Sequence, residues 1–311
     1  MRRLRLGTRG SRLALIQAAI LTARLETLGV QVEQVPMKTE GDLRAPDTTP
    51  GEGVFVAAIT RALLEGEVDL AVHSAKDVPL DEPDGLIAVY PERADARDAI
   101  AARPDTWSAA GLPRGSSVGS DSPRRKGFLL ALRPDLEVRP LHGNVDTRLK
   151  RLDRHEVDAL VLAAAGLDRL GLGARAARRF RPSELPPAPA QGALAVQARR
   201  TDKEAVRLLE AIDAPEVRLA VIAERAVLSG TGGGCKAPVG AYARLRAGSL
   251  FLIAAAVDEE GGNVRFVREV LPADVEFARR LACEAGRRLR EPSATGLNHK
   301  GARRWPKSSP S

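Results

Sequence analysis

Apolar and polar residues alternate along the chain with two periods, which mark successive strands and helices. Leu4–Thr8 and Val30–Thr39 alternate with the period of strands, whereas Leu13–Leu28 and Phe55–Leu64 have helical spacing. An apolar strand follows at Leu70–His73 and ends in a polar turn. This order of strands and helices predicts an α/β fold with a parallel sheet that is covered by helices on both faces.

The same alternation starts again near Arg97. Ser116–Ser120 and Leu136–Asn144 are predicted strands, each followed by a helix, and the buried strand in Val157–Gly166 leads into another helix. This segment, at 96–189, is therefore a second predicted α/β domain.

A proline-rich linker at Pro182–Pro189 ends the second unit. The strand pattern then resumes at Ala190–Arg199, and its placement predicts that the chain returns to the first domain. That domain is expected to comprise 1–95 and 190–212. Two α/β units joined by crossing segments suggest a hinged cleft that closes on a ligand.

Residues 213–290 form a third predicted unit, a small α+β domain. Helices are predicted at Glu216–Leu228 and Asp274–Leu289, with the glycine run Gly230–Gly240 after the first helix. The strands are predicted at Val239–Leu245, Leu250–Val257 and Val264–Leu271. The polar, basic tail at 291–311 is expected to be disordered.

Composition narrows the class of protein. The two cysteines among 311 residues cannot make a disulfide framework, which fits a reducing compartment, and we expect a cytoplasmic protein. No signal peptide and no membrane-spanning run is expected. The net charge of +8 is consistent with anionic partners and equally with a solvated arginine-rich surface. Nucleic acid is one candidate, but aromatic residues make up only 3% and no nucleic-acid-binding motif is present.

Cationic and hydroxyl side chains gather at the predicted strand ends, where ligands of such sheets bind. In the first unit they accompany Asp77, and in the second they lie at strand ends or helix starts. The residues are Arg9, Ser11, Ser74 and Lys76 in the first unit, and Arg124, Arg125, His142 and Arg148 in the second. Several arginines suit a ligand with several carboxylates, although surface ion pairing is the better explanation for any single one.

Asp77 and Cys235 each allow more than one interpretation. Asp77 is either a turn-capping residue or a carboxylate that holds a cationic intermediate or transfers protons. Cys235, in "GTGGGCKAPVG", is a packing residue, a nucleophile or a covalent attachment point. The distant Cys283 lies on an amphipathic helix and is expected in the core, so no metal site is predicted.

The chain resembles the porphobilinogen deaminase family, also called hydroxymethylbilane synthases. The stretches that carry the resemblance run in order from Leu4 to Leu289, and "HSAKDVP" together with "GGCKAPVG" is highly specific. The others are "LGTRGSRLALIQA", "RRKGFLLALRPDLEVRPLHGNVDTRL", "DALVLAAAGLDRLGL" and "LPPAPAQGALAVQAR".

The resemblance implies three domains, of which the first two are like hinged periplasmic binding proteins. It also implies a transferase that joins four porphobilinogen units into the linear tetrapyrrole hydroxymethylbilane and releases ammonia. A dipyrromethane cofactor would be attached by a thioether to Cys235, and Asp77 would be the catalytic residue. Residues matching the family's cofactor and substrate contacts are Arg9, Ser11, Ser74, Lys76, Ser120, Ser122, Arg124, Arg125, Arg148 and Gln191.

Three positions depart from the family pattern, and each makes the binding surface less positive. His142 and Glu52 stand where the family commonly has arginine and lysine, and Asp121 lies beside the matching arginines. These changes predict weaker binding of anionic substrate. The alternative function is a non-catalytic module of the same hinged fold that binds carboxylates. For the enzyme we expect a monomer that binds neither nucleic acid nor membrane and whose product passes to a uroporphyrinogen synthase.

Overall fold

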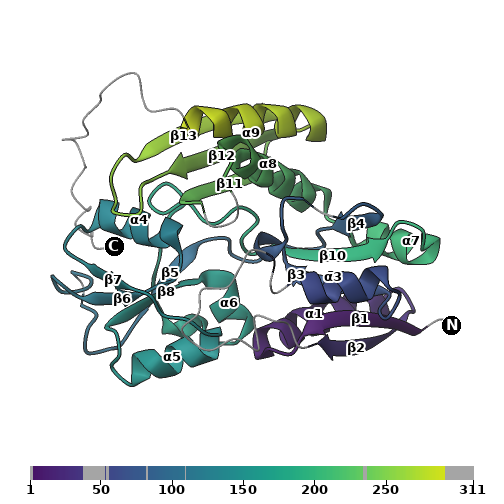
Figure 1. The fold of residues 1–311 in the computed structure, drawn as a ribbon, viewed down its shortest axis with the longest axis horizontal. Coiled ribbons are helices and arrows are strands. Elements are labelled where there is room, and N and C mark those ends of the chain that lie inside the picture. The colour runs from purple at the N-terminus through teal and green to yellow at the C-terminus, as the bar shows by residue number, and fades with distance from the viewer. Residues whose placement is uncertain are drawn as a thin grey trace.

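The computed structural model describes residues 3–37, 53, 56–81, 83–108, 110–233 and 237–290. Glu52, Cys235 and the tail at 291–311 therefore lie outside the described residues. The described chain forms three sheets, each with its own helices, and the three units pack against one another (Figure 1). These sheets give two α/β units and one small α+β unit, as the fold class predicted from the sequence requires.

The first sheet has five strands in the order β2-β1-β3-β10-β4. Its strands are β1 (Arg3–Arg9), β2 (Gln31–Met37), β3 (Leu70–Ser74), β4 (Leu86–Val89) and β10 (Leu194–Arg199). Leucines of β1 and β3 pack under α1 (Arg12–Glu26) and α7 (Lys203–Ile212) on one face. The other face is covered by α3 (Ala57–Leu64). The predicted return of the chain to the first sheet is confirmed.

The parallel arrangement predicted for the first three strands is confirmed, but the sheet as a whole is mixed. β1, β2 and β3 are parallel, but β10 runs antiparallel to both of its neighbours, β3 and β4. The reason lies in the crossing segment. The chain re-enters the first sheet at the carboxyl end of β3, where Leu194 pairs with Ser74, so it can only run back along that strand.

The second sheet has the order β7-β6-β8-β5-β9. Its strands are β5 (Asp98–Ala102), β6 (Ser117–Gly119), β7 (Glu137–Arg139), β8 (Ala159–Ala163) and β9 (Ala176–Arg179). Its helices are α4 (Pro123–Leu132), α5 (Val145–Asp153) and α6 (Ala164–Arg169). Here too the sheet is mixed, because β5 is antiparallel to β8. The strands β4, β5 and β9 and the helix α7 were not predicted.

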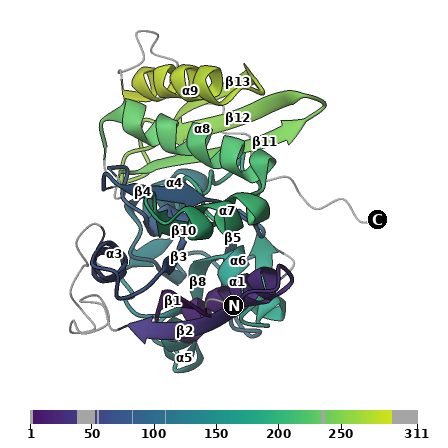
Figure 2. The same ribbon diagram turned by 90° about the vertical axis from the view of Figure 1, so that its right-hand side faces the viewer.

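The third sheet is antiparallel and consists of β11 (Val239–Arg246), β12 (Ser249–Ala256) and β13 (Arg265–Pro272). Two helices, α8 (Pro215–Thr231) and α9 (Val275–Arg290), lie side by side on one face of it (Figure 2). They approach closely because Gly230 and Gly286 have no side chain: a Cβ at either position would clash with the other helix.

Side chains from all three units meet at the centre of the molecule. Ala255 and Val257 at the end of β12 join the core of the second unit, beneath Phe128 of α4. Val221 of α8 packs against Tyr90 and Ala193 of the first unit. None of the helices in the described part of the chain is long and apolar enough to cross a membrane.

Candidate active site

The carboxyl end of β3 carries the first group of predicted site residues. β3 ends at Ser74, and the single 3-10 turn η1 (Ala75–Asp77) follows it directly. The Ser74 hydroxyl accepts a hydrogen bond from the Gln17 side chain of α1 at 3.0 Å. Asp77 is half-buried, and its side chain makes no hydrogen bond or ion pair with any described residue. The turn therefore presents a carboxylate that is available to a ligand.

Lys76 is the cation nearest to this carboxylate along the chain, and it points toward Gln191. Its Nζ donates to Gln191 Oε1 at 3.4 Å. Burial lowers the pKa of the Lys76 ammonium and the charge of Arg125 lowers it further, although Asp77 raises it. The Gln191 amide is fixed in turn, since its Nε2 donates to Ala96 O at 2.8 Å and to Asp98 Oδ1 at 3.0 Å.

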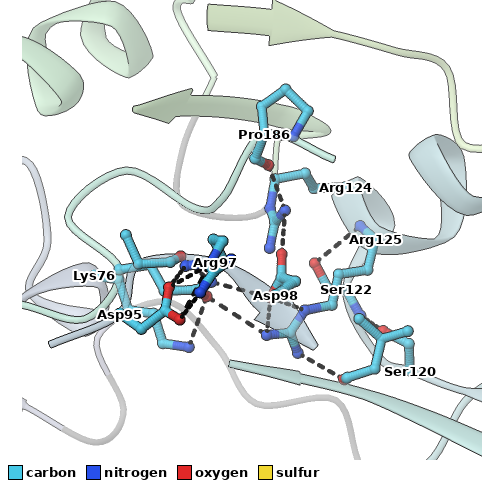
Figure 3. A network of polar contacts seen from close by, with 12 residues as sticks. Lys76, Asp95, Arg97, Asp98, Ser120, Ser122, Arg124, Arg125 and Pro186 are labelled. Carbon is cyan, nitrogen blue, oxygen red and sulfur yellow. Dashed lines mark hydrogen bonds and ion pairs between the residues drawn. The ribbon is translucent and has the colours of Figure 1, made fainter. Parts of the chain in front are cut away.

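Asp98, at the start of β5, is the centre of this polar network (Figure 3). Its side chain is fully buried and forms ion pairs with Arg124 at 2.8 Å and with Arg125 at 2.7 Å. Arg124 also donates to Pro186 O at 2.6 Å, and Arg125 to Val161 O at 3.1 Å. The two arginines thus connect the start of β5 with β8 and with the linker.

Arg124 and Arg125 were expected to line the cleft. In the structure only 4% of Arg124 and 7% of Arg125 is exposed, and both bind Asp98. Burial alone would raise the pKa of Asp98, but the two guanidinium groups lower it below its usual range. One carboxylate against two guanidiniums leaves a net positive charge under the site.

The hydroxyl groups of Ser120 and Ser122 lie at the N-terminus of α4. Ser122 caps the helix by accepting from Arg125 N at 3.4 Å, and Ser120 Oγ accepts from Ser122 N at 3.3 Å. Pro123 at the first helical position favours a helix start there. The hydroxyl protons and the positive end of the helix dipole are suited to an anion.

Arg148, on α5, forms a separate cluster with two of the residues that depart from the family pattern. Asp121 Oδ2 lies 3.0 Å from Arg148 Nη2, and Asp121 Oδ1 lies 3.1 Å from His142 Nδ1. The backbone of Leu141 also donates to Asp121 at 2.8 Å. Arg148 Nε is buried and has no hydrogen-bond partner in the described part of the protein. Burial lowers the pKa of Arg148, and Arg125 lowers it further.

The end of β1 carries Arg9, which is half-buried, and Ser11, which caps α1 by accepting from Ala14 N at 3.3 Å. Neighbouring His73 is buried, and burial lowers its pKa from 6.5 to about 4, with a smaller contribution from the positive charge of Arg9. The imidazole is therefore neutral at physiological pH.

The structure thus brings Lys76, Gln191, Arg124 and Arg125 into one network, with Ser120 and Ser122 beside it. Sequence reasoning missed the residue that joins them, Asp98. A signal was present: an aspartate opens the apolar strand "DAIAA", a position that favours burial. Among the described residues, no three His, Cys, Asp or Glu side chains gather where they could hold a metal ion.

Cys235 is not described, but the structure shows how the chain approaches it. α8 ends at Thr231, and Gly232 follows in a left-handed conformation with φ 66°. Such a residue favours glycine and turns the chain away from a helix. Cys235 comes three residues after Gly232.

Sequence comparison finds two family models that together span most of the chain. The first, described as "Porphobilinogen deaminase, dipyromethane cofactor binding domain", matches residues 4–207, and the second, "Porphobilinogen deaminase, C-terminal domain", matches residues 218–291. A porphobilinogen deaminase of Acidothermus cellulolyticus is 45% identical over 95% of this chain and 94% of its own. Another, of Roseiflexus castenholzii, is 45% identical over 87% of this chain and 91% of its own.

Among solved structures, the chain is similar to a putative lipoprotein from Actinomyces odontolyticus, with a TM-score of 0.42, 16% identity, and coverage of 68% of this chain and 89% of that one. It is also similar to the periplasmic VFT2 domain of Bordetella pertussis BvgS, with a TM-score of 0.41 and 17% identity over 68% of this chain and 86% of that domain.

Proposed function

Because this chain belongs to the porphobilinogen deaminase family, it is a transferase, and we propose that Asp77 is its catalytic residue. The enzyme joins four porphobilinogen units into hydroxymethylbilane on a dipyrromethane cofactor and releases ammonia at each addition. The matches support this activity and not a non-catalytic carboxylate-binding module. The observation that carries the proposal is the half-buried carboxylate of Asp77, which no described residue binds and which lies close enough to Lys76 to raise the pKa of that ammonium.

The residues present fit a dipyrromethane, whose rings bear acetate and propionate groups. Arg148 has a buried guanidinium nitrogen without a hydrogen-bond partner among the described residues, and Lys76 and the hydroxyls of Ser120 and Ser122 add further donors. When bound, the cofactor supplies the pyrrole carbon to which the first substrate ring is added. Cys235 is the proposed thioether anchor.

Asp77 acts by charge and by proton transfer. When ammonia leaves, positive charge develops on the pyrrole ring of the substrate, and a carboxylate at about 4 Å stabilises it by about 4 kcal/mol. The same carboxylate can accept the proton that the new carbon–carbon bond displaces. Because no described residue binds the Asp77 side chain, ring binding breaks no existing ion pair.

The remaining cationic and hydroxyl side chains of the site bind the carboxylates of the substrate. We assign this role to Arg9, Ser11, Ser74, Lys76 and Arg148, with Gln191 holding Lys76 in place. Arg124 and Arg125 contribute mainly positive charge from beneath the site, because Asp98 occupies part of each guanidinium. Any direct contact of Arg124 or Arg125 with substrate has to come from guanidinium N–H groups that do not bind Asp98, Pro186 or Val161.

The wider setting of the enzyme is also part of the proposal. We divide the chain into domains at 1–95 plus 190–212, 96–189 and 213–290, with the cleft between the first two. The enzyme is proposed to be a cytoplasmic monomer whose product passes to a uroporphyrinogen synthase. The first two units have separate sheets and are joined by the crossing segments between β4 and β5 and between β9 and β10, an arrangement that supports a hinge between them.

The test is the substitution Asp77→Asn, which keeps the size of the side chain and removes its charge. Ammonia release from porphobilinogen should fall about 1,000-fold, the range expected for loss of a positioned acid–base group. Asp84→Asn, at an exposed position of the following loop, is the matched control and should retain wild-type activity.

Mass spectrometry of the same proteins, intact and after digestion, distinguishes an error in the role of Asp77 from an error in the enzymatic function itself. A mass increase of two porphobilinogen units, each without its ammonia, on the Cys235 peptide of the wild type shows that the cofactor is assembled. If Asp77→Asn then keeps more than a tenth of the activity, Asp77 is not catalytic. If the wild type has neither adduct nor turnover, the enzymatic function itself is wrong.

A further inference from the structure

A groove of about 650 Å³ lies between α8, α9 and part of the first unit. We call it the α8–α9 groove. Residues of both helices line it, together with Leu80, Asp81 and Tyr90 of the first unit. Figure 2 shows the two helices running side by side along this part of the molecule. The volume lies in the range of small-molecule sites, and none of the proposed catalytic residues borders it.

The charge of the groove is unbalanced. Four arginines line it against the carboxylates of Asp81 and Glu276. Glu276 is already paired with Arg279 at 2.8 Å. Arg280 and Arg287 form no ion pair with any residue that the structure describes, although each is exposed on the groove side of α9. Within the described part of the chain, the groove therefore holds two guanidinium groups that are not ion-paired with a carboxylate.

An aromatic ring lies beside these cations. Phe277 is 53% exposed, and the guanidinium of Arg280 lies 5.1 Å from the centre of its ring. Arg280 and Arg287 are seven residues apart on one helix, which places them about 10 Å apart along its axis. An exposed phenyl ring costs free energy in water unless something covers it. The pattern suits a planar ring system with a carboxylate at each end.

We propose that the α8–α9 groove is a second anion-binding site, for a planar aromatic dicarboxylate or polycarboxylate. Its ring would lie against Phe277, and its carboxylates would pair with Arg280 and Arg287. Bidentate pairing with two carboxylates requires arginine rather than lysine geometry, and both positions are arginine.

Arg225 couples the groove to the catalytic turn. It lines the groove from α8 and donates to Val78 O at 2.8 Å and to Pro79 O at 2.6 Å. These carbonyl groups directly follow Asp77 in the chain. An anion that draws the Arg225 guanidinium toward the groove weakens those two hydrogen bonds. Binding of an anion in the α8–α9 groove is therefore expected to disturb the position of Asp77 and to lower kcat. It is not expected to compete with substrate.

The test uses the holoenzyme with naphthalene-2,6-dicarboxylate as the probe and calorimetry as the readout. The double variant Arg280→Ala, Arg287→Ala should weaken binding of the probe at least tenfold. Arg288→Ala is the matched control, because Arg288 lies on the same helix but pairs with Glu269 outside the groove. It should change the affinity less than twofold. Suberate, which has two carboxylates but no ring, should bind more weakly than the probe.

Two further readouts locate the probe. Cys283 lines the groove, so bound probe should slow its alkylation by iodoacetamide, measured on the Cys283 peptide. With porphobilinogen varied, the probe should lower kcat and leave KM unchanged.

The proposed site is overturned if the wild type does not bind the probe, or if the wild type and the double variant bind it equally well. Purely competitive inhibition also overturns the site, because it places the probe in the catalytic cleft. Binding without any change in kcat overturns the coupling through Arg225. The binding and alkylation readouts do not depend on turnover, so they remain decisive even if the proposed catalytic role of Asp77 fails.

Discussion

Asp121 shows how a single residue changes the character of a binding surface. Its carboxylate lies between Arg148 and His142, at 3.0 and 3.1 Å. Two departures from the family pattern, Asp121 and His142, are thus in contact and form one cluster. If Arg148 binds a substrate carboxylate as proposed, Asp121 competes with the substrate for it.

Replacing Asp121 by Asn should therefore improve substrate binding. KM for porphobilinogen is expected to fall about fivefold at constant kcat, because about 1 kcal/mol of ion-pair energy no longer opposes the substrate carboxylate. Asp146→Asn is the control: Asp146 is on the same helix as Arg148 but pairs with Arg12. A rise in KM for Asp121→Asn, measured by steady-state kinetics, would show instead that Asp121 is needed to orient Arg148.

The buried side chain of His73 is expected to make the folding stability of the protein depend on pH. Its folded pKa, lowered by burial to about 4, lies below the ordinary value of 6.5. Above pH 6.5 the imidazole is neutral in both states and pH has no effect through it. Between pH 6.5 and about 4 only the unfolded chain takes up the proton, so stability falls as pH falls.

The loss should total about 3 kcal/mol of unfolding free energy over this window. In the variant His73→Gln this part of the pH dependence should disappear, as measured by urea unfolding at a series of pH values. The exposed His155 provides the control, since His155→Gln should leave the curve unchanged. Identical pH curves for the wild type and His73→Gln would show that His73 titrates normally.

At the scale of elements, α8 is the helix whose side chains bind residues of the first unit, of the crossing segment and of the third unit. The Glu224 side chain of α8 is fully buried, and its carboxylate accepts two hydrogen bonds from the Arg93 guanidinium, at 2.7 and 2.9 Å. The same carboxylate accepts from Ala190 N in the crossing segment, at 2.7 Å, and from Ala243 N of β11, at 2.6 Å. Ala190 has a positive φ of 64°, which is unfavourable for alanine. Glu224 therefore fixes a strained backbone next to Gln191.

The substitution Glu224→Gln should cost about 3 kcal/mol or more, because it leaves the Arg93 charge buried without a compensating carboxylate. Glu216→Gln changes the same residue type at an exposed position in the first turn of α8 and should cost less than about 0.5 kcal/mol. Chemical unfolding of the three proteins decides the point. Equal stability of Glu224→Gln and the wild type would rule out a structural role for the pair.

Most elements with long periodic patterns were predictable from the sequence, whereas several short ones were not. α1, α8, α9 and the three strands of the third sheet all lie within a few residues of their predicted ranges. β4 and β5 were missed because an apolar run of four or five residues is ambiguous without its neighbours. α7 was missed although its apolar residues have clear helical spacing. The direction of β10 depends on where the chain re-enters the sheet, which no local pattern contains.

The candidate site shows the same division. The placement of candidate residues at strand ends and helix starts was predictable, because such ends can be recognised locally. The pairing of Asp98 with Arg124 and Arg125 was not, since β5 and α4 meet only in the folded chain. Burial of those two arginines was therefore missed, and their direct contact with substrate stays a prediction.

At the scale of the whole molecule, we expect charge to govern the approach of substrate. The net charge of +8 and the cations of the cleft attract an anionic pyrrole. Raising the salt concentration from about 10 mM to about 200 mM should therefore lower kcat/KM about fivefold, because the Debye length shrinks from about 30 Å to less than 10 Å. Under saturating substrate kcat should hardly change. A kcat/KM independent of salt would exclude electrostatic steering.

The order of strands in the first sheet has a consequence for synthesis on the ribosome. In that sheet β4 pairs only with β10, and β10 also covers one edge of β3. β10 leaves the ribosome roughly a hundred residues after β4, which takes on the order of ten seconds. During this interval the amino-terminal half has an open sheet edge and an incomplete core, a form prone to aggregation. The second unit has all five of its strands before β10 appears and can fold first, so the nascent first unit is where a chaperone would bind.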